Sequence, residues 1–287
     1  MRPQAAAMKV LLSKPALQVM PGCYDAVGAH LIAEAGFPVG FASGSSITAA
    51  RLAMPDMGML SIVEMRDAVA EITAAAPSVL WLADGDTGYG NEIAVQRTVR
   101  EYARAGAAAI LIEDKAWPQP LAASAGKTVV DREAARLRLR AAVHAAHDEG
   151  VLLLARTDAR LTLGLEEALA RLRLFAEVGA DLLYLDSPQT EAEMRAFVEI
   201  CGDKPAVAVT SLSARYYMPD NDGLTRCGVR LVIHPQNILA ASIHAARRVL
   251  AGLRGGENPP MATGEELASA VRKAEYLATA ARLTKRD

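Results

Sequence analysis

The sequence has few of the residues that mark several well-defined classes of protein. Its 287 residues include only three cysteines, an odd number, and none of them forms a CxxC pair. Neither a disulfide framework nor a structural zinc site is therefore indicated. Aromatic residues make up 5% of the chain, and the net charge is only −2. Nucleic-acid binding usually requires a basic face, so we expect no nucleic-acid partner.

Long apolar runs are also missing. No apolar stretch approaches the ~20 residues that a membrane-spanning helix needs, so we expect no membrane partner. Lys14 and Pro15 follow the short apolar run at residues 10–12, which is too brief for the core of a signal peptide. Apolar residues still make up 52% of the chain and charged residues 22%. This composition is typical of a globular protein, and we predict a cytoplasmic enzyme.

What the chain does contain is a regular alternation of short apolar runs and segments with helical periodicity. Strands are predicted at residues 18–21, 39–42, 79–83, 109–112, 152–156, 182–185, 206–209 and 230–233, and helices at residues 25–35, 62–75, 92–105, 132–148, 165–178 and 191–200. Strict alternation predicts a parallel sheet, and eight strands favour a closed (β/α)8 TIM barrel of the α/β class over an open, doubly wound sheet. Glycines 36, 106, 179 and 228 each stand between a helix and the next strand, which indicates one repeated unit.

The segment after the eighth predicted strand continues with helical patterns. Residues 238–253 form an amphipathic pattern, and residues 265–283 resume it after two glycines and two prolines. We expect a catalytic barrel domain at residues 1–253 and a C-terminal helical extension at residues 254–287, packed on the barrel or on a partner subunit. Extra helices must bury their apolar faces, so we predict a homodimer or homotetramer.

Acidic residues stand where the third predicted strand ends. The strand at residues 79–83 is apolar throughout, and the sequence DGDTGYG follows it at residues 84–90. Asp84 and Asp86 lie on one face of the chain if the backbone stays extended. Removing a carboxylate from water is costly unless it has a partner, and a hard divalent cation is the simplest partner.

Other predicted strands also end in polar residues, and catalytic groups of TIM barrels stand at those ends. These residues are Ser43, Gly44, Ser45, Glu113, Arg156, Asp158, Asp186 and His234. A set of oxygen donors without cysteine suits Mg²⁺ or Mn²⁺ better than zinc. Arg156 would grip a substrate carboxylate or phosphonate in a bidentate fork. For Asp158 or Asp186 alone, a helix cap or a salt-bridge partner is the simpler interpretation.

Several motifs together resemble one known family. They are DGDTGYGN at residues 84–91, IEDK at residues 112–115, ARTDA at residues 155–159, Ser43-Gly44 followed by Pro55-Asp56, and Gly126-Lys127. In this order and spacing the chain resembles the isocitrate lyase / phosphoenolpyruvate mutase superfamily from about residue 21 to residue 253. The resemblance implies a (β/α)8 barrel that binds Mg²⁺ and cleaves or forms C–C or C–P bonds in small 2-oxo or 2-hydroxy acids. It also implies dimers of helix-swapped dimers, which would account for the surplus C-terminal helices.

The resemblance also implies roles for individual residues. Asp84 would contact the metal directly, while Asp86, Glu113 and Asp56 would hold its waters. Ser43, Gly44 and Ser45 would cradle a substrate carboxylate, with Tyr24 as a further substrate contact. The catalytic candidates are Arg156, Asp56 and His234. The expected intermediate is enolate-like, and Mg²⁺ would stabilise its negative charge as a Lewis acid.

The chain departs from this family at one loop. Lyases of the family carry a catalytic cysteine in the loop after the fourth strand, and Leu121 stands at that position here. The mutase and phosphonopyruvate hydrolase branches carry a lysine and an asparagine in this loop. In this chain Gln119 and Leu121 stand at those two positions. Decarboxylation of a β-keto acid requires least from this loop, so we favour a Mg²⁺-dependent decarboxylase or lyase with oxaloacetate as the first substrate.

Three alternatives remain open at this point. A C–C lyase acting on 2-methylisocitrate or dimethylmalate would need another group, such as His234, Tyr89 or Lys115, in place of the cysteine. A C–P bond hydrolase or mutase is the second alternative. The third is a homologue that binds a 2-oxo acid without turnover.

Overall fold

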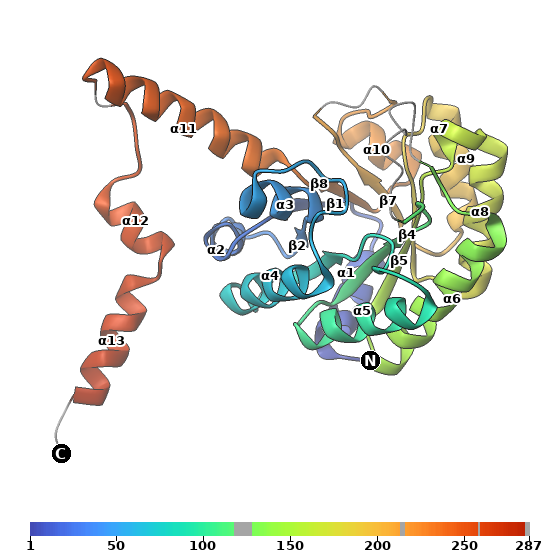
Figure 1. Ribbon diagram of the computed structural model, residues 1–287, viewed down its shortest axis with the longest axis horizontal. Coiled ribbons are helices and arrows are strands. Elements are labelled where there is room, and N and C mark those ends of the chain that lie inside the picture. Colours follow the sequence, from blue (N-terminus) through green and yellow to red (C-terminus); the bar gives the residue numbers. More distant parts are fainter. Residues whose placement is uncertain (118–127, 213–215, 258, 285–287) are drawn as a thin grey trace.

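The predicted barrel is confirmed in the computed structural model, which describes residues 1–117, 128–212, 216–257 and 259–284. Its parallel strands are β1 (Gln18–Cys23), β2 (Val39–Ala42), β3 (Leu80–Asp84), β4 (Ala109–Glu113), β5 (Leu152–Thr157), β6 (Leu182–Leu185), β7 (Ala206–Val209) and β8 (Leu231–His234). They pair in chain order, and β8 closes the ring by pairing with β1 (Figure 1). The chain is therefore a TIM barrel.

The described helices follow the strands around the outside of the barrel, with one before β1 and others after β8. They are α1 (Pro3–Leu12), α2 (Ala26–Glu34), α3 (Gly44–Leu52), α4 (Ile62–Ala75), α5 (Glu92–Arg104), α6 (Arg132–Glu149), α7 (Arg160–Leu163), α8 (Leu165–Val178), α9 (Glu191–Cys201), α10 (Asn221–Cys227), α11 (Asn237–Gly255), α12 (Gly264–Ala270) and α13 (Lys273–Thr284). Polar N-caps begin many of them; Ser61, for example, forms a capping box with Glu64 at the start of α4.

Four of the described helices, α1, α3, α7 and α10, were not among those predicted from the sequence, and two of them, α1 and α3, bear on the barrel interior and the site. Helix α1 buries Ala5, Met8 and Leu12 against the residues that fill the barrel. Helix α3 begins at Gly44, where the sequence suggested a polar loop, because the Ser43 side chain caps the Ser46 N–H group. A short helix therefore presents its N-terminus at the end of β2.

Two apolar cores lie on the two faces of the sheet. The inner core contains side chains that project into the barrel, such as Leu82, Leu111 and Leu154. The outer core lies between the strands and the helices, and includes Trp81, Ile110 and Leu153, which alternate with the inner residues. This alternation decides which residue at each strand end faces the mouth of the barrel.

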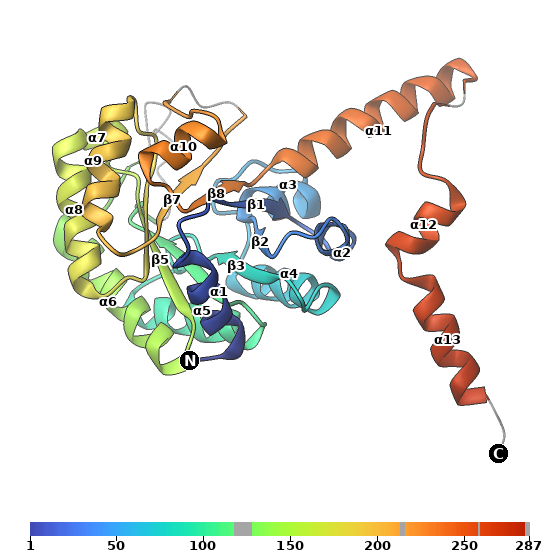
Figure 2. The same cartoon turned by 180° about the vertical axis from the view of Figure 1, so that it is seen from behind.

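The C-terminal helices leave the barrel. Helix α11 extends away from the barrel after β8, and α12 and α13 follow it (Figure 2). None of these three helices buries a residue. The helix predicted at residues 265–283 is in fact two helices, because Arg272 adopts a left-handed backbone conformation with φ of 54°. Departure from the barrel begins at α11, although the domain boundary predicted at residue 253 stays a prediction.

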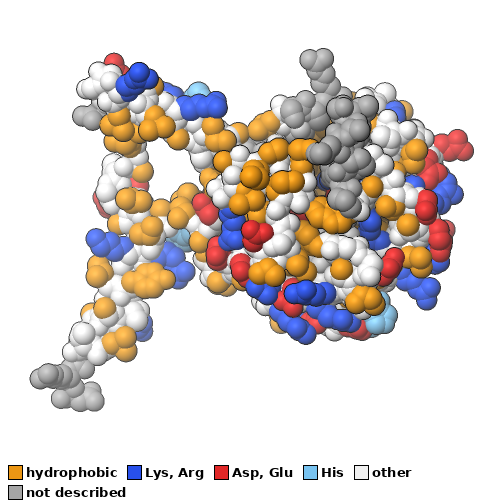
Figure 3. All heavy atoms as spheres, viewed as in Figure 1, with side chains coloured by type: hydrophobic (Ala, Val, Ile, Leu, Met, Phe, Trp, Pro, Cys, Tyr) orange, Lys and Arg blue, Asp and Glu red, His pale blue; other side chains and the backbone are white. Residues whose placement is uncertain are grey.

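We call α11, α12 and α13 the C-terminal arm. The space-filling view shows apolar side chains along the arm and an opening between it and the barrel (Figure 3). Leu250, Leu267 and Tyr276 are each more than 60% exposed there. None of the described helices, in the arm or elsewhere, has the length and apolar character required to cross a membrane.

Candidate active site

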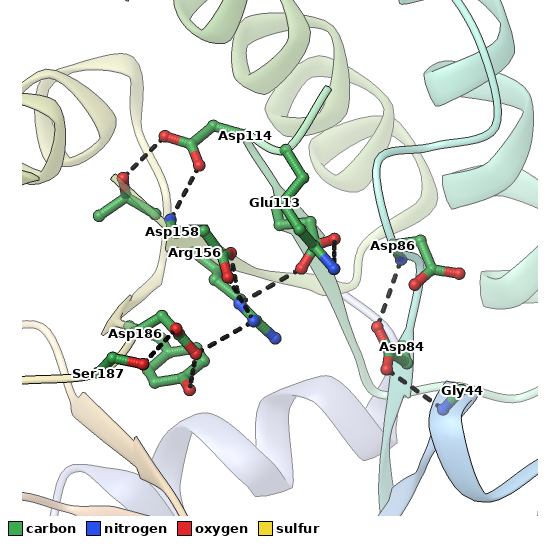
Figure 4. Close-up of polar contacts among 12 residues, drawn as sticks. Gly44, Asp84, Asp86, Glu113, Asp114, Arg156, Asp158, Asp186 and Ser187 are labelled. Carbon is green, nitrogen blue, oxygen red and sulfur yellow. Dashed lines mark hydrogen bonds and ion pairs between the residues drawn. The ribbon is translucent and has the colours of Figure 1, made fainter. Parts of the chain in front are cut away.

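The polar residues at the ends of β3, β4 and β5 converge at the mouth of the barrel. Asp84 continues the inward-facing series of Leu82, and Glu113 and Arg156 do the same on the next two strands. Glu113 and Arg156 are paired residues in the β4–β5 register, so their side chains start side by side. Figure 4 shows Arg156 at the centre of a group of carboxylates, with Glu113 between it and Asp84.

Arg156 is bound by three carboxylates. Its Nε and Nη2 atoms donate to the two carboxylate oxygens of Asp158 at 2.7 and 2.6 Å. Nη2 also donates to Asp186 at 3.1 Å, and Nε lies 3.3 Å from Glu113. From the sequence we expected this two-donor edge of the guanidinium, Nε and Nη2, to bind a substrate anion. In the structure it is already paired with Asp158. Among the described residues Nη1 has no hydrogen-bond partner, so it is the donor through which this guanidinium can meet an anion.

Asp186, which β6 presents to Arg156, is held from three sides. The hydroxyl of Tyr184 donates to its Oδ1 at 2.8 Å, and the hydroxyl of Ser187 donates to its Oδ2 at 2.7 Å. The Tyr184 ring also lies beneath the Arg156 guanidinium, 5.1 Å from its Cζ. The sequence left Asp158 and Asp186 open as ordinary salt-bridge partners, and both are indeed paired with Arg156.

Asp84 faces the N-terminus of α3. The Gly44 N–H group donates to its Oδ2 at 3.2 Å. A β-carbon at position 44 would lie 3.0 Å from that oxygen, so glycine allows the helix to approach the carboxylate closely. Ser43 and Ser45, which were predicted with Gly44 to cradle a substrate anion, lie in the same first turn, with their hydroxyl oxygens 3.2 Å apart. A helix N-terminus favours negative charge in front of it.

Asp86 does not share a face with Asp84 in the way an extended backbone would require. Strand β3 ends at Asp84, and Asp86 has a left-handed conformation with φ of 47°. Its N–H group donates to Asp84 Oδ1 at 3.3 Å, while its own Oδ2 accepts a hydrogen bond of 2.9 Å from the Tyr89 hydroxyl. Asp86 is therefore close to Asp84 but turned toward Tyr89.

The carboxylates at the mouth raise one another's pKa. Burial, followed by the charges of Glu113 and Asp56, raises the pKa of Asp84 to about 6. Burial and the charge of Asp84 raise the pKa of Asp86 well above its ordinary value. Burial lowers the pKa of Lys115, but the charges of Glu113, Asp158 and Asp56 together outweigh this effect, so the pKa of Lys115 is raised. Such a concentration of negative charge favours binding of a cation.

The donor set fits a hydrated Mg²⁺ ion better than a fully protein-coordinated metal. Within the described ranges, no three His, Cys, Asp or Glu side chains form a ready metal-binding group. Mg²⁺ usually keeps several waters and binds protein through only one or two carboxylates. Glu113 Oε1 lies 2.7 Å from Lys115 Nζ but has no hydrogen bond of good geometry, so it retains acceptor capacity.

A buried network behind the site was not recognised in the sequence. Asp114 accepts hydrogen bonds from the Thr157 hydroxyl at 2.7 Å and the Asp158 N–H group at 2.9 Å, and Arg171 pairs with it at 3.0 Å. From α6, Arg138 donates to the carbonyl oxygens of Glu113 and Lys115. These bonds fix the ends of β4 and β5. The one sequence signal for this network is Asp114, an acidic residue beside Glu113 in the IEDK motif.

Three predicted residues lie apart from this group. His234 is the residue after the inward-facing Ile233, so it faces outward and lines a groove of about 480 Å³ with Leu31 and Ile238. Its Nδ1 atom lies 3.1 Å from the Thr210 hydroxyl. The Tyr24 hydroxyl contacts Ser242 of α11 at 2.9 Å. Asp56 is exposed on the loop after α3, although its charge still acts on Asp84 and Asp86.

All three cysteines of the chain lie in the outer core. Cys23 is on the outward face of β1, and Cys201 and Cys227 end α9 and α10. Burial raises the pKa of each thiol. None of them faces the mouth of the barrel. The prediction for Leu121 concerns a position outside the described residues.

Comparison with known proteins gives a consistent result. The family model described as phosphoenolpyruvate phosphomutase matches residues 8–254. The chain is 36% identical over 271 residues to a chloroplastic carboxyvinyl-carboxyphosphonate phosphorylmutase of Arabidopsis thaliana, covering 91% of this chain and 79% of the relative. Identity is also 36% over 251 residues with 2,3-dimethylmalate lyase of Eubacterium barkeri, covering 87% and 84%. An oxaloacetate decarboxylase of Rhodopseudomonas palustris is 30% identical over 280 residues, covering 96% and 95%.

Solved structures of similar proteins superpose over almost the whole chain. Oxaloacetate acetylhydrolase in complex with 3,3-difluorooxalacetate has a TM-score of 0.90 and 31% identity, covering 97% of each chain. Phosphonopyruvate hydrolase in complex with oxalate and Mg²⁺ has a TM-score of 0.88 and 28% identity, covering 99% of this chain and 100% of the other. Proteins with this barrel thus bind small oxo-acid ligands, and at least one of them binds Mg²⁺.

Proposed function

Because the chain belongs to the phosphoenolpyruvate mutase / isocitrate lyase superfamily, whose members act on small 2-oxo and 2-hydroxy acids, we propose that it is a Mg²⁺-dependent decarboxylase of a small 2-oxo acid. Oxaloacetate is the substrate we favour. The reaction passes through an enolate-like intermediate and leaves pyruvate and carbon dioxide.

One observation carries this proposal. The mouth of the barrel combines carboxylates and an arginine with no thiol, since all three cysteines lie in the outer core. Leu121, which cannot exchange a proton, stands where lyases of the family carry their cysteine. Loss of carbon dioxide from a β-keto acid does not need a general acid or base at that point. Of the reactions considered, decarboxylation therefore requires the fewest catalytic groups beyond those that this chain has.

The metal would be held mainly by Asp84, with Glu113, Asp86 and Asp56 binding its waters. When bound, Mg²⁺ supplies Lewis-acid stabilisation for negative charge that develops on the 2-oxo oxygen. Manganese has similar ligand preferences and is an acceptable substitute. The ion pair between Glu113 and Lys115 orients this carboxylate.

The chain's own residues would bind and orient the substrate. The first turn of α3 would cradle a substrate carboxylate through the Ser45 N–H group and the Ser43 and Ser45 hydroxyls, since the Gly44 N–H group is already bonded to Asp84. Arg156 contributes the Nη1 donor, while Asp158 and Asp186 hold the rest of its guanidinium in place. His234 is left out of the proposed catalytic set because it faces the outer groove.

The proposal is tested by incubating the purified protein with [¹³C]oxaloacetate and Mg²⁺ and following products by NMR. Pyruvate formation above the rate of metal alone supports it. Formation of no pyruvate across the range from pH 6 to pH 8 contradicts it. Addition of EDTA should return the reaction to the uncatalysed rate, and Asp67→Ala, a change of an exposed acid on α4, should leave it unaffected.

Two other reactions have specific support from similarity. Oxaloacetate acetylhydrolase has a TM-score of 0.90 with this chain, and in that case the same NMR experiment would yield oxalate and acetate. The 36% identity to 2,3-dimethylmalate lyase favours a C–C lyase, which would act on 2,3-dimethylmalate or 2-methylisocitrate. Binding of oxalate in the presence of Mg²⁺ without any product would instead indicate a homologue that binds without turnover.

We also propose that the C-terminal arm packs on a partner subunit in a helix-swapped homodimer or a homotetramer. The support is the exposure of Leu250, Leu267 and Tyr276 on the arm, together with the uncovered apolar groove beside β1 and β8. Contiguous apolar surfaces of this kind usually mark an interface. Light scattering after size-exclusion chromatography measures the assembly directly, and a monomer would contradict the proposal.

A further inference from the structure

Three aromatic side chains contact one another in succession next to Asp86, one of the residues proposed to hold the waters of the metal. They are Tyr102 in α5, Tyr89 in the turn after β3, and Trp117 after β4, and we call them the aromatic column. Tyr102 has no exposed surface. Its hydroxyl lies 3.2 Å from the Tyr89 hydroxyl, and the rings of Tyr89 and Trp117 meet edge to face at 6.1 Å.

The hydroxyl groups of the column form a directed chain. The Tyr89 hydroxyl donates to Asp86 Oδ2 at 2.9 Å, which is the direction required of a carboxylate that meets a metal ion, because an ionised carboxylate can only accept hydrogen bonds. The Tyr89 oxygen is then available as the acceptor for Tyr102. The order of donation is therefore from Tyr102 to Tyr89 to Asp86. A buried phenol that donates in such a chain strengthens the next bond by polarising it.

The backbone around these groups is held in an uncommon conformation. Asp86 and Tyr89 are non-glycine residues with φ of 47° and 59°. Such conformations cost free energy and persist only when surrounding contacts enforce them. The turn is held by hydrogen bonds from Thr98 to the Gly88 carbonyl at 3.0 Å and from the Glu113 N–H group to the Asp86 carbonyl at 2.9 Å. The Tyr102 bond adds a side-chain restraint to this turn.

The other end of the column is fixed as well. The Trp117 ring packs on Gly58, where a β-carbon would lie 2.2 Å from its Cζ3 atom. Gly58 follows Asp56 by two residues, and Trp117 follows Lys115 by two. Tyr89 thus contacts Trp117 through its ring and Tyr102 through its hydroxyl, and these contacts restrain the direction of its hydroxyl toward Asp86.

We propose that Tyr102 is a positioning residue for the metal site: acting through Tyr89, it fixes the orientation in which Asp86 meets the waters of a bound Mg²⁺ ion. The inference rests on the proposed function insofar as that function requires Mg²⁺ at Asp84. It adds a residue on a helix, away from the mouth of the barrel, to the machinery that binds the metal. Residues that orient metal ligands in this way typically change affinity by about 10- to 100-fold when they are removed.

The test is calorimetric titration of Mg²⁺ into the full chain without substrate, for the unaltered protein, Tyr89→Phe, Tyr102→Phe and the double variant. We expect Tyr89→Phe to weaken binding by about 10-fold or more and Tyr102→Phe to weaken it several-fold. The double variant should match Tyr89→Phe, because the Tyr102 hydroxyl acts only through Tyr89. Tyr217→Phe, which removes a tyrosine hydroxyl from Glu191 instead, is the matched control and should bind Mg²⁺ normally.

The outcomes separate the two claims. If the unaltered chain binds no Mg²⁺, both the proposed function and this inference are overturned. If it binds Mg²⁺ but Tyr102→Phe binds equally well, or if the losses in the double variant add, only the inference is overturned. Thermal unfolding measured alongside identifies a purely packing role, since that would lower the melting temperature and leave the affinity unchanged. Should Tyr102→Phe fail to fold, Tyr102→Leu, which also lacks the hydroxyl, must weaken Mg²⁺ binding at least several-fold.

Discussion

The mouth of the barrel buries charged groups, whereas the C-terminal arm exposes apolar groups to solvent, and both situations cost free energy. At the mouth, charged groups such as Glu113 and Asp158 are almost fully buried, and each is paired with a cation two residues away in the sequence, Lys115 and Arg156 respectively. On the arm, apolar side chains such as Leu267 and Tyr276 are more than 60% exposed. Buried charge is stabilised by a counter-ion, whereas exposed apolar surface is stabilised by a protein partner.

The comparison also shows why the two regions carry different information about function. The mouth is built from residues of one chain, and its chemistry can be argued from their distances. The arm meets its own barrel at few places, such as the Tyr24–Ser242 hydrogen bond, and leaves large apolar side chains exposed. Its role therefore depends on what covers those side chains. Changes at the mouth should therefore alter metal binding and turnover, and changes on the arm should alter assembly.

The largest effect should come from Asp84→Ala. This change removes the proposed direct metal ligand, and we expect activity to fall by at least about 10³-fold, since the metal stabilises the transition state by several kcal/mol. Calorimetry should detect no Mg²⁺ binding. Asp67→Ala, which removes an exposed carboxylate paired with Arg66, is the control and should retain both properties. Full activity of Asp84→Ala would break the assignment of the mouth as a metal site.

Removal of the outer part of the arm, α12 and α13, should change assembly and leave the barrel folded. A chain that ends at Gly255 loses α12 and α13, and we expect light scattering to report a smaller assembly than for the full chain. Leu267→Asp on the arm should weaken assembly in the same direction. Ile93→Asp is the control, because it changes an apolar residue that is 72% exposed on the barrel. It should not change the mass of the assembly in solution. An unchanged mass after truncation would show that the arm is not an interface.

Arg156→Lys should affect both stability and turnover. A lysine cannot reproduce the two bonds to Asp158, and a buried carboxylate without its partner costs about 3 kcal/mol or more. We expect urea unfolding to detect this loss and kcat/KM to fall by about 10²-fold, as for other lost anion donors. Arg160→Lys is a matched control, because Arg160 makes a similar fork with Glu193 near the surface, where the effect should stay under about 1 kcal/mol.

The smallest effect is a pH dependence of Mg²⁺ affinity. The pKa of Asp84 is raised to about 6, so below that pH the carboxyl group is mostly protonated and protons compete with the metal. The contribution of Asp84 to affinity should level off above pH 6 and should fall by up to about tenfold for each pH unit below 6. Calorimetry at pH 5, 6 and 7.5 measures this. An affinity that does not change between pH 5 and pH 7.5 would contradict the assignment of Asp84 as the ligand.

Much of this molecule could be predicted from its sequence, and the failures are informative. The eight strands follow from uninterrupted apolar runs, and their number and alternation with helices predicted the barrel. The tyrosine that orients Asp86 was missed, because Tyr102 belongs to the apolar face of a helix and gives no separate signal. The α3 helix was missed because serine and glycine at positions 43–45 are typical of both loops and helix starts.

The sequence by itself determined the architecture and the chemical types at the strand ends, because buried parallel strands require continuous apolar runs and charged residues can stand only where those runs stop. The tertiary structure decided which of those residues meet. A strand that is apolar on both faces does not reveal its inward face, so only the closed barrel turns Asp84, Glu113 and Arg156 toward one another. The same alternation turns His234 outward, one residue after the inward-facing Ile233.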